Sequence, residues 1–118
     1  VHVIEATLDD GTSGLYCEAI QTIIIDEHMT DVQKRCSLTH ELFHWLHADD
    51  SHAEYGKSHA EWRVRRETAM FLIDPADYVQ AEREYDGEIY QMSCEMDVTV
   101  FLLEDYRRIL EYRQPIHD

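Results

Sequence analysis

The pattern of apolar and polar positions divides the chain into a β-rich first quarter and a helical remainder. Short β-prone pieces are expected at 2–4, 6–8, 15–17 and 21–26. A turn-forming cluster at 9–14 separates the second piece from the third. The last piece contains Ile23-Ile24-Ile25, a β-branched run that favours a strand buried on both faces. We therefore expect a small, mostly antiparallel sheet at the N-terminus.

Helical spacing of apolar residues begins near residue 30. Thr30 has the side chain of an N-cap, and Gln33 stands where it completes a capping box, so a long helix is expected from there to about Ala48. Ser58 is expected to cap a second helix, with Glu61 as its capping-box partner. Helices after the first are expected at 58–73, 74–85, 88–96 and 98–112. The pattern predicts an α+β fold in which about five helices pack against the sheet.

The composition restricts the domain number and the class of partner. With 118 residues, the chain has the length of one domain, so a single domain over residues 1–118 is expected. Ten Lys and Arg stand against 25 Asp and Glu, which gives a net charge of −15 with His neutral. Such a surface repels a phosphate backbone, so direct binding of nucleic acid is not expected. A basic partner protein agrees better with this charge.

Cysteine usage and hydropathy indicate the compartment. The three cysteines, Cys17, Cys36 and Cys94, form an odd set without C-x-x-C spacing. A disulfide framework is therefore not expected, and a reducing cytoplasm agrees best with the sequence. No run approaches the roughly 18 apolar residues that a membrane span needs, so no membrane association is expected.

The chemistry of the chain is concentrated in one short motif. His40-Glu41-Leu42-Phe43-His44 matches the pattern H-E-x-x-H. Residues four apart lie on one face of a helix, with about 5–6 Å between their Cβ atoms, so His40 and His44 can both bind one zinc ion. Glu41 follows the first histidine and can take a proton from the attacking water. The motif predicts a catalytic metal site with Glu41 as the base.

A catalytic zinc site needs a third protein ligand. The second expected helix carries Glu61, which would complete a ligand set of two histidines and one glutamate. Glu67, His59 and Glu54 are further candidates from the same region.

Three stretches resemble a known family. Gly14-Leu15-Tyr16, followed by Ile23-Ile24-Ile25, resembles the family's opening strands. The run from Gln33 to Leu42 resembles its arginine-led approach to the H-E-x-x-H helix. The segment from Glu61 to Pro75 resembles its second signature, a Glu followed by a helix that ends before Pro. Over nearly its whole length the chain is similar to the ImmA/IrrE family of metallopeptidases.

This resemblance implies a fold, a site and a role. The fold would be zincin-like, with the H-E-x-x-H motif on the first long helix. His40, His44 and Glu61 would be zinc ligands and Glu41 the catalytic base. Family members are often encoded by phages or mobile elements, and they cleave or release a transcriptional repressor. The resemblance thus implies a zinc-dependent endopeptidase that acts on a regulatory protein, for example a basic DNA-binding repressor.

Two other functions stay open at this stage. The chain could be a metal-containing binding module that sequesters a repressor by contact, with negligible turnover. Alternatively, the metal could be structural, with Cys36 as a fourth ligand, because Cys36 shares the helix face of His40. His47, three residues after His44, is a weaker ligand candidate, since one straight helix does not easily place three side chains around a tetrahedral ion.

Several other residues have a possible role near the site. His52, Tyr55 and His59 are candidates for stabilising the oxyanion that forms on the attacked carbonyl. The cluster Arg63, Arg65 and Arg66 is expected to pair with nearby acids or to contact a partner. Residues 92–103 resemble a helix-turn-helix in pattern, but 87–113 carry six acids and three arginines, a charge of −3. We interpret that region as a helical hairpin that packs the core or contacts a partner.

Overall fold

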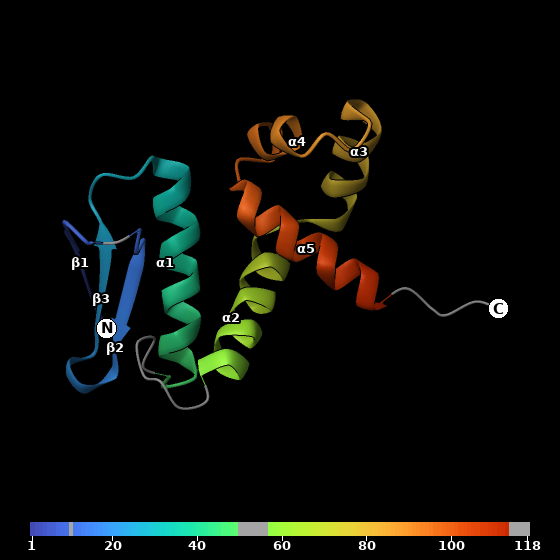
Figure 1. Cartoon of the computed structure of the whole chain (residues 1–118). Helices are drawn as coiled ribbons and strands as arrows, with labels where there is room; N and C mark the ends of the chain where they lie inside the picture. Colours follow the sequence, from blue (N-terminus) through green and yellow to red (C-terminus); the bar gives the residue numbers. More distant parts are fainter. Residues whose placement is uncertain (10, 50–56, 114–118) are drawn as a thin grey trace.

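The computed structural model describes residues 1–9, 11–49 and 57–113, and its fold is α+β (Figure 1). A three-stranded sheet lies on one side of helix α1 (Asp31–Leu46), and helix α2 (Lys57–Leu72) lies on the other. The remaining helices extend from α2 away from the sheet. The first long helix, which carries His40, Glu41 and His44, therefore lies in the interior of the molecule.

The sheet is mixed rather than mostly antiparallel. Its strands are β1 (His2–Ala6), β2 (Gly14–Cys17) and β3 (Thr22–Asp26), in the order β1-β3-β2. β1 pairs with β3 in parallel and β2 pairs with β3 in antiparallel. The parallel pair arises because the chain leaves β1, forms β2 at the far edge, and returns through a 3-10 turn (Glu18–Ile20) to place β3 in the middle.

The isoleucine run forms a strand, β3, as its β-branched composition predicts, and this strand lies in the middle of the sheet. Ile23 and Ile25 are buried, whereas Ile24 between them is half-buried. Complete burial is thus restricted to one face of β3, and the expectation of burial on both faces is wrong. Helix α1 covers the sheet on one side only, which explains the difference.

Helix α1 begins where its capping residues predict, whereas two later helices do not. Thr30 Oγ1 accepts a hydrogen bond from the Gln33 amide at 3.2 Å, and the Thr30 amide donates to Gln33 Oε1 at 2.9 Å, which confirms the capping box of α1. The last helix begins two residues later than expected, because the Thr99 hydroxyl accepts from the Leu102 amide. Helix α2 begins at Lys57, so Ser58 is already a helical residue and the expectation that it caps this helix is wrong. The helices after α2 are α3 (Pro75–Tyr85), α4 (Ile89–Met96) and α5 (Val100–Arg113).

Two apolar clusters stabilise the two sides of the molecule. The sheet core consists of the buried residues Tyr16, Ile23 and Ile25. The helical core is larger and contains buried residues of α1 to α5 and of the turns between them. Its members are Cys36, Ala69, Ile73, Tyr78, Ala81, Met92, Val98, Leu102, Leu103, Tyr106 and Ile109. Helix α1 contributes to both, because Leu38, Leu42 and Trp45 pack on the sheet core while Cys36 belongs to the helical core.

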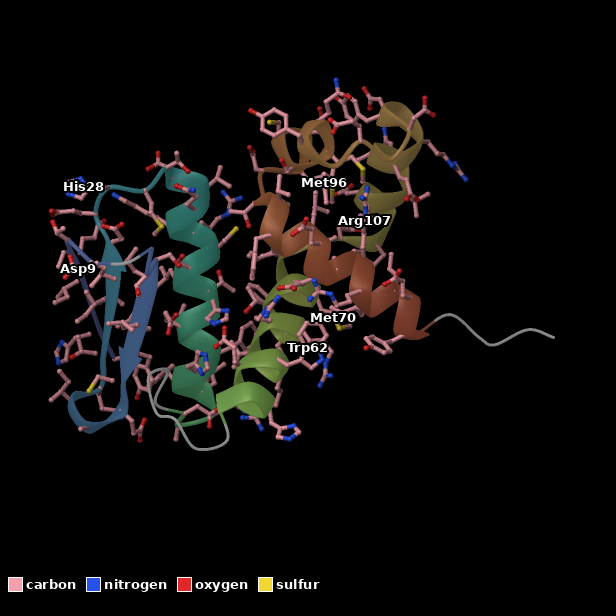
Figure 2. The ribbon with its side chains drawn as sticks, in the orientation of Figure 1. Asp9, His28, Trp62, Met70, Met96 and Arg107 are labelled. Atoms are coloured by element: carbon pink, nitrogen blue, oxygen red, sulfur yellow. The ribbon has the colours of Figure 1, made fainter. Side chains whose placement is uncertain are left out.

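The C-terminal helices pack the core as a hairpin, in agreement with the interpretation of residues 92–103. Met92 of α4 and Leu103 of α5 are fully buried. Arg107 of α5 reaches back to the turn after α3 and donates to the Gly87 carbonyl at 2.6 Å (Figure 2). None of the helices in the described ranges has the length and apolar character that would let it cross a membrane.

Candidate metal centre

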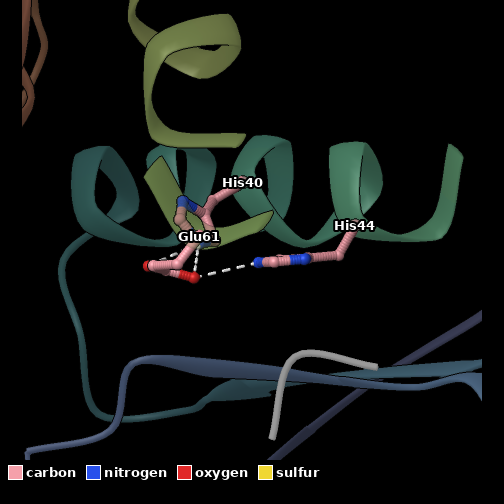
Figure 3. Close-up of side chains that lie close together, drawn as sticks. All are labelled: His40, His44 and Glu61. Carbon is pink, nitrogen blue, oxygen red and sulfur yellow. Dashed lines mark hydrogen bonds and ion pairs between the residues drawn. The ribbon is translucent and has the colours of Figure 1, made fainter. Parts of the chain in front are cut away.

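Three side chains from two helices converge between α1 and α2 (Figure 3). His40 and His44 lie one turn apart on α1, and their rings are 5.0 Å apart between centroids. Glu61, from α2, approaches both. His44 Nε2 is 3.1 Å from Glu61 Oε1, and His40 Nε2 is 3.2 Å from Glu61 Oε2. The one possible ligand atom offered by each residue lies within 4.8 Å of the other two.

These separations suit a tetrahedral metal ion. Ligands bound to zinc at about 2.0–2.1 Å in a tetrahedron are about 3.3–3.4 Å from one another. Glu61 Oε1 alone lies 3.1 Å from His44 Nε2 and 3.3 Å from His40 Nε2, close to that value. Two imidazole nitrogens and one carboxylate are also a donor set of catalytic zinc sites, which keep a fourth position open. The geometry and the chemistry of the three residues therefore fit such an ion.

The electrostatics of the group favour a cation between its members. Burial alone would raise the pKa of Glu61, but the hydrogen bonds from His40 and His44 outweigh burial and hold its pKa well below the usual value. Burial lowers the pKa of His40, yet the hydrogen bond and the charge of Glu61 raise it above the ordinary value overall. The Glu61 carboxylate is therefore ionised and attracts positive charge, whether from a proton on His40 or from a metal ion.

Glu41 lies beside this group at the contact between α1 and the sheet. Its side chain is only 5% exposed. Gly14 of β2 faces it, since a Cβ atom at Gly14 would lie 3.2 Å from Glu41 Cγ and 3.5 Å from Glu41 Oε2. The absence of a side chain at Gly14 therefore lets the strand approach the Glu41 carboxylate closely.

The site opens into a cleft of about 740 Å³. One wall is formed by β2 and the turn before it, and the opposite wall by α2 and the start of α5. His40, Glu41 and Glu61 line the cleft, and so do Arg65, Phe101 and Asp105. β2 is an edge strand of the sheet, so its outer side has no strand partner among the described residues. An extended peptide in the cleft would lie next to an unpaired strand edge.

The other ligand candidates lie outside the group. Glu67 Oε1 lies 2.6 Å from His47 Nε2, so these two residues form a separate pair. Cys36 is buried in the helical core, and in the described ranges it is not one of the residues that could share an ion with His40. His59 is exposed on α2. Glu54, His52 and Tyr55 lie outside the residues that the structure describes.

The structure adds site residues that the sequence reasoning missed. Gly14 was noted only for its resemblance to a family strand, and nothing in the sequence connects it with Glu41. The expected pairing of the arginines with acids is confirmed for Arg65, whose partner is Asp105, forty positions away, but its place in the lining of the cleft is not foreseen. Its position one helical turn after Glu61 is a signal that could have placed it near the site.

Comparison with known proteins identifies the family. The model of the IrrE N-terminal-like domain, a peptidase family, matches residues 1–100. Searches of curated proteins and of solved structures found no match. The matched region contains the sheet, α1 to α4 and every residue of the three-membered group. The chain belongs to the family of peptidases with an IrrE N-terminal-like domain.

Proposed function

We propose that this chain is a zinc-dependent endopeptidase in which His40, His44 and Glu61 hold the metal and Glu41 is the catalytic base. The observation that carries the proposal is the convergence of these three donors, at separations suited to a tetrahedral ion, beside a buried Glu41. The membership in a peptidase family supports the same reaction class. Glu61 is preferred over Glu67 as the third ligand because Glu67 pairs with His47.

Each residue of the site has a distinct task in peptide hydrolysis. A zinc ion held by His40, His44 and Glu61 would supply Lewis-acid chemistry, by which the scissile carbonyl would be polarised and water made more acidic. Glu41 takes the proton from the attacking water and passes it to the leaving amine. Its burial and its contact with Gly14 restrict the carboxylate to a small range of positions. The free edge of β2 offers backbone groups that can align the substrate as an added strand.

The proposed substrate is a regulatory protein, for example a basic DNA-binding repressor. A net charge of −15 favours encounter with a basic partner and disfavours nucleic acid. The resemblance to the ImmA/IrrE family supports the same class of substrate and an origin in a phage or mobile element. We further propose that residues 1–118 act as one domain and that the protein works in the cytoplasm.

A second function is favoured by the charge alone. An acidic surface would also serve a metal-containing module that sequesters a basic repressor without cleaving it. In that case the zinc site would stabilise the fold rather than catalyse. The two functions differ in the role of Glu41, which is essential only for cleavage.

Metal content is the first test. Purified protein should contain about one zinc per chain, and His44→Ala should lose it. His47→Ala is the matched control, because His47 is on the same helix and pairs with Glu67 instead. Elemental analysis gives both numbers. A wild-type protein that stays metal-free after zinc is supplied would rule out the endopeptidase.

Substitution of the proposed base separates cleavage from binding. Glu41→Gln should retain zinc and substrate affinity while the cleavage rate falls by at least about 100-fold, the lower range for a positioned general base. The rate is measured by mass spectrometry on candidate repressors, and binding by titration calorimetry. Equal, slow cleavage by wild type and variant, with binding intact, would favour the sequestering module.

A further inference from the structure

Arg65 is held rigidly in the wall of the cleft. Its Nε donates to Asp105 Oδ2 at 3.0 Å and its Nη2 donates to Asp105 Oδ1 at 2.6 Å. Asp105 is only 3% exposed, and Arg65 keeps partial access to the cleft. A bidentate pair of this kind fixes the plane of the guanidinium group. The bonds occupy one edge of the group and leave the Nη1 donors without a bond to Asp105.

The charge of Arg65 is not cancelled by its partner. Arg108 Nη1 also donates to Asp105 Oδ1, at 3.2 Å, so two guanidinium groups share one carboxylate. One positive charge therefore remains in excess within this cluster. The Asp105 carboxylate keeps the pKa of Arg65 above its ordinary value, which means that this positive charge is permanent.

Aromatic rings surround the guanidinium group. Arg65 Cζ lies 4.6 Å from the centroid of the Phe101 ring and 5.5 Å from that of Trp62. Trp62 is on the side of α2 that faces α5, where Arg108 also approaches its ring (Figure 2). Such contacts hold the cation in place and exclude water from its flanks. Thr99 and Leu102, at the start of α5, line the same wall of the cleft.

We propose that Arg65 binds a carboxylate of the substrate and thereby determines which peptide bond meets Glu41. The inference rests on the proposed peptidase function and specifies its substrate. The ligand chemistry is a carboxylate. An Asp or Glu side chain within the substrate supplies one, as an endopeptidase requires, and a C-terminal carboxylate supplies one if the enzyme instead acts at the end of a chain. Arg65 is one helical turn from Glu61, so the bound carboxylate lies close to the scissile bond.

This local preference is compatible with a basic substrate. The net charge of −15 acts over the whole surface and favours basic proteins at encounter. Arg65 acts only over the contact distance inside the cleft. A basic protein with one acidic residue near its cleavage site would satisfy both the long-range charge and the contact with Arg65. The position of that acidic residue would determine which peptide bond is cleaved.

A degenerate decapeptide library tests the proposal. It is synthesised once with a free C-terminus and once amidated, and presented to zinc-loaded Glu41→Gln protein so that binding is measured without turnover. Captured peptides are identified by mass spectrometry. If a side chain supplies the carboxylate, Asp or Glu should be enriched about tenfold over Asn or Gln at one position of the captured peptides. If the C-terminus supplies it, peptides with a free C-terminus should be enriched about tenfold over the amidated ones. A tenfold ratio is what one charge-assisted hydrogen bond predicts. Which of these two enrichments is observed identifies the source of the carboxylate.

Variants of Arg65 test whether the preference for a carboxylate depends on this residue. Arg65→Gln, made in the Glu41→Gln background, should bring the enrichment close to one, and Arg65→Lys should retain part of it. Arg66→Gln is the matched control, because Arg66 is exposed and does not line this cleft. If loss of Arg65 unfolds the protein by leaving Asp105 poorly paired, the double variant Arg65→Gln/Asp105→Asn removes both charges.

The outcomes separate this inference from the peptidase function. Zinc-loaded wild type that cleaves the library while the Glu41→Gln protein shows no acid or C-terminal enrichment would overturn the role of Arg65 and leave the peptidase intact. Enrichment that depends on Arg65 without any cleavage by the wild type would support the carboxylate site and contradict the peptidase. Enrichment that survives Arg65→Gln would also overturn the inference.

Discussion

The sheet core and the helical core differ strongly in size. Among the described residues, three buried side chains form the sheet core, whereas eleven form the helical core. The two histidines and Glu41 lie on α1, whose half-buried Leu38, Leu42 and Trp45 pack on the smaller core. Only the start of this helix, with Val32 and Cys36, packs on the larger one. Glu61 comes from α2, which contributes Ala69 to the larger one. The metal group is therefore assembled from two differently stabilised parts of the molecule.

This difference indicates what the metal does besides chemistry. Three buried residues provide little hydrophobic stabilisation, so the sheet with α1 depends on its contacts with the helices. Polar links supply such contacts, among them Glu61 with the two histidines, His47 with Glu67, and Arg35 Nη2 with the Asp97 carbonyl. A metal ion bound by residues from both helices strengthens the first link.

Removal of Glu61 should have the largest effect on the connection between the two parts. Glu61→Gln should lower zinc affinity by at least about 100-fold, because the site loses its only anionic ligand among the three. Competition with a chromophoric chelator measures the affinity. Zinc should raise the melting temperature of the wild type but not that of the variant.

The control for this prediction is Glu67→Gln. Glu67 is on the same helix and contacts His47 rather than the metal group, so this variant should bind zinc as the wild type does. Wild-type zinc affinity in Glu61→Gln would contradict the proposed ligand set. It would also mean that the metal does not connect the two cores.

Matched core substitutions compare the two parts directly. Ile23→Ala in the sheet core and Leu103→Ala in the helical core each truncate a side chain that is 0% exposed. Each should lower the free energy of unfolding by about 2–5 kcal/mol. If residues 1–118 unfold as one domain, each variant should show one transition in urea, at the same midpoint by circular dichroism and by fluorescence.

Trp45 provides a local probe for this comparison. It packs against the sheet core, and in a Trp62→Phe background it is the only tryptophan in the chain. In Ile23→Ala, its fluorescence transition should coincide with the loss of helix measured by circular dichroism. Two separate midpoints would show that the sheet with α1 unfolds before the helical core, and would contradict the single domain.

Features set by neighbouring residues could be predicted from the sequence. The capping box of Thr30 and Gln33 and the shared helix face of His40 and His44 depend on spacings of three and four residues, which a helix converts directly into contacts. The isoleucine run likewise predicts a strand, although not its half-buried face.

Features set by distant residues could not be predicted in the same way. The parallel pairing of β1 with β3 depends on which strand occupies the middle of the sheet, and local spacing carries no information about that. The choice of Glu61 over Glu67 depends on how α1 and α2 cross. The contact of Gly14 with Glu41 joins positions 27 apart, and only the packing of α1 on β2 brings them together.

A methyl group at Gly14 should affect catalysis more than folding. In Gly14→Ala the new Cβ would meet Glu41 Cγ and Ile25 Cδ1, both at 3.2 Å, so Glu41 must shift by a few tenths of an ångström. The cleavage rate should fall about tenfold, because a general base works only at the correct distance. Zinc content should be unchanged. A variant with normal activity would show that Glu41 acts from a position away from β2.

The smallest effect is expected at the start of α1, far along the helix from His44. Thr30→Ala removes the hydroxyl that accepts from the Gln33 amide at 3.2 Å, so the free energy of unfolding should fall by about 1 kcal/mol. Activity per bound zinc should stay at the wild-type level, because Thr30 is exposed and does not line the cleft. Urea denaturation and cleavage assays measure the two quantities, and Thr30→Ser should behave as the wild type. A loss of activity in Thr30→Ala at full zinc loading would mean that fraying of the first turn reaches His40, and that α1 is held too weakly by the small sheet core to keep its histidines in place.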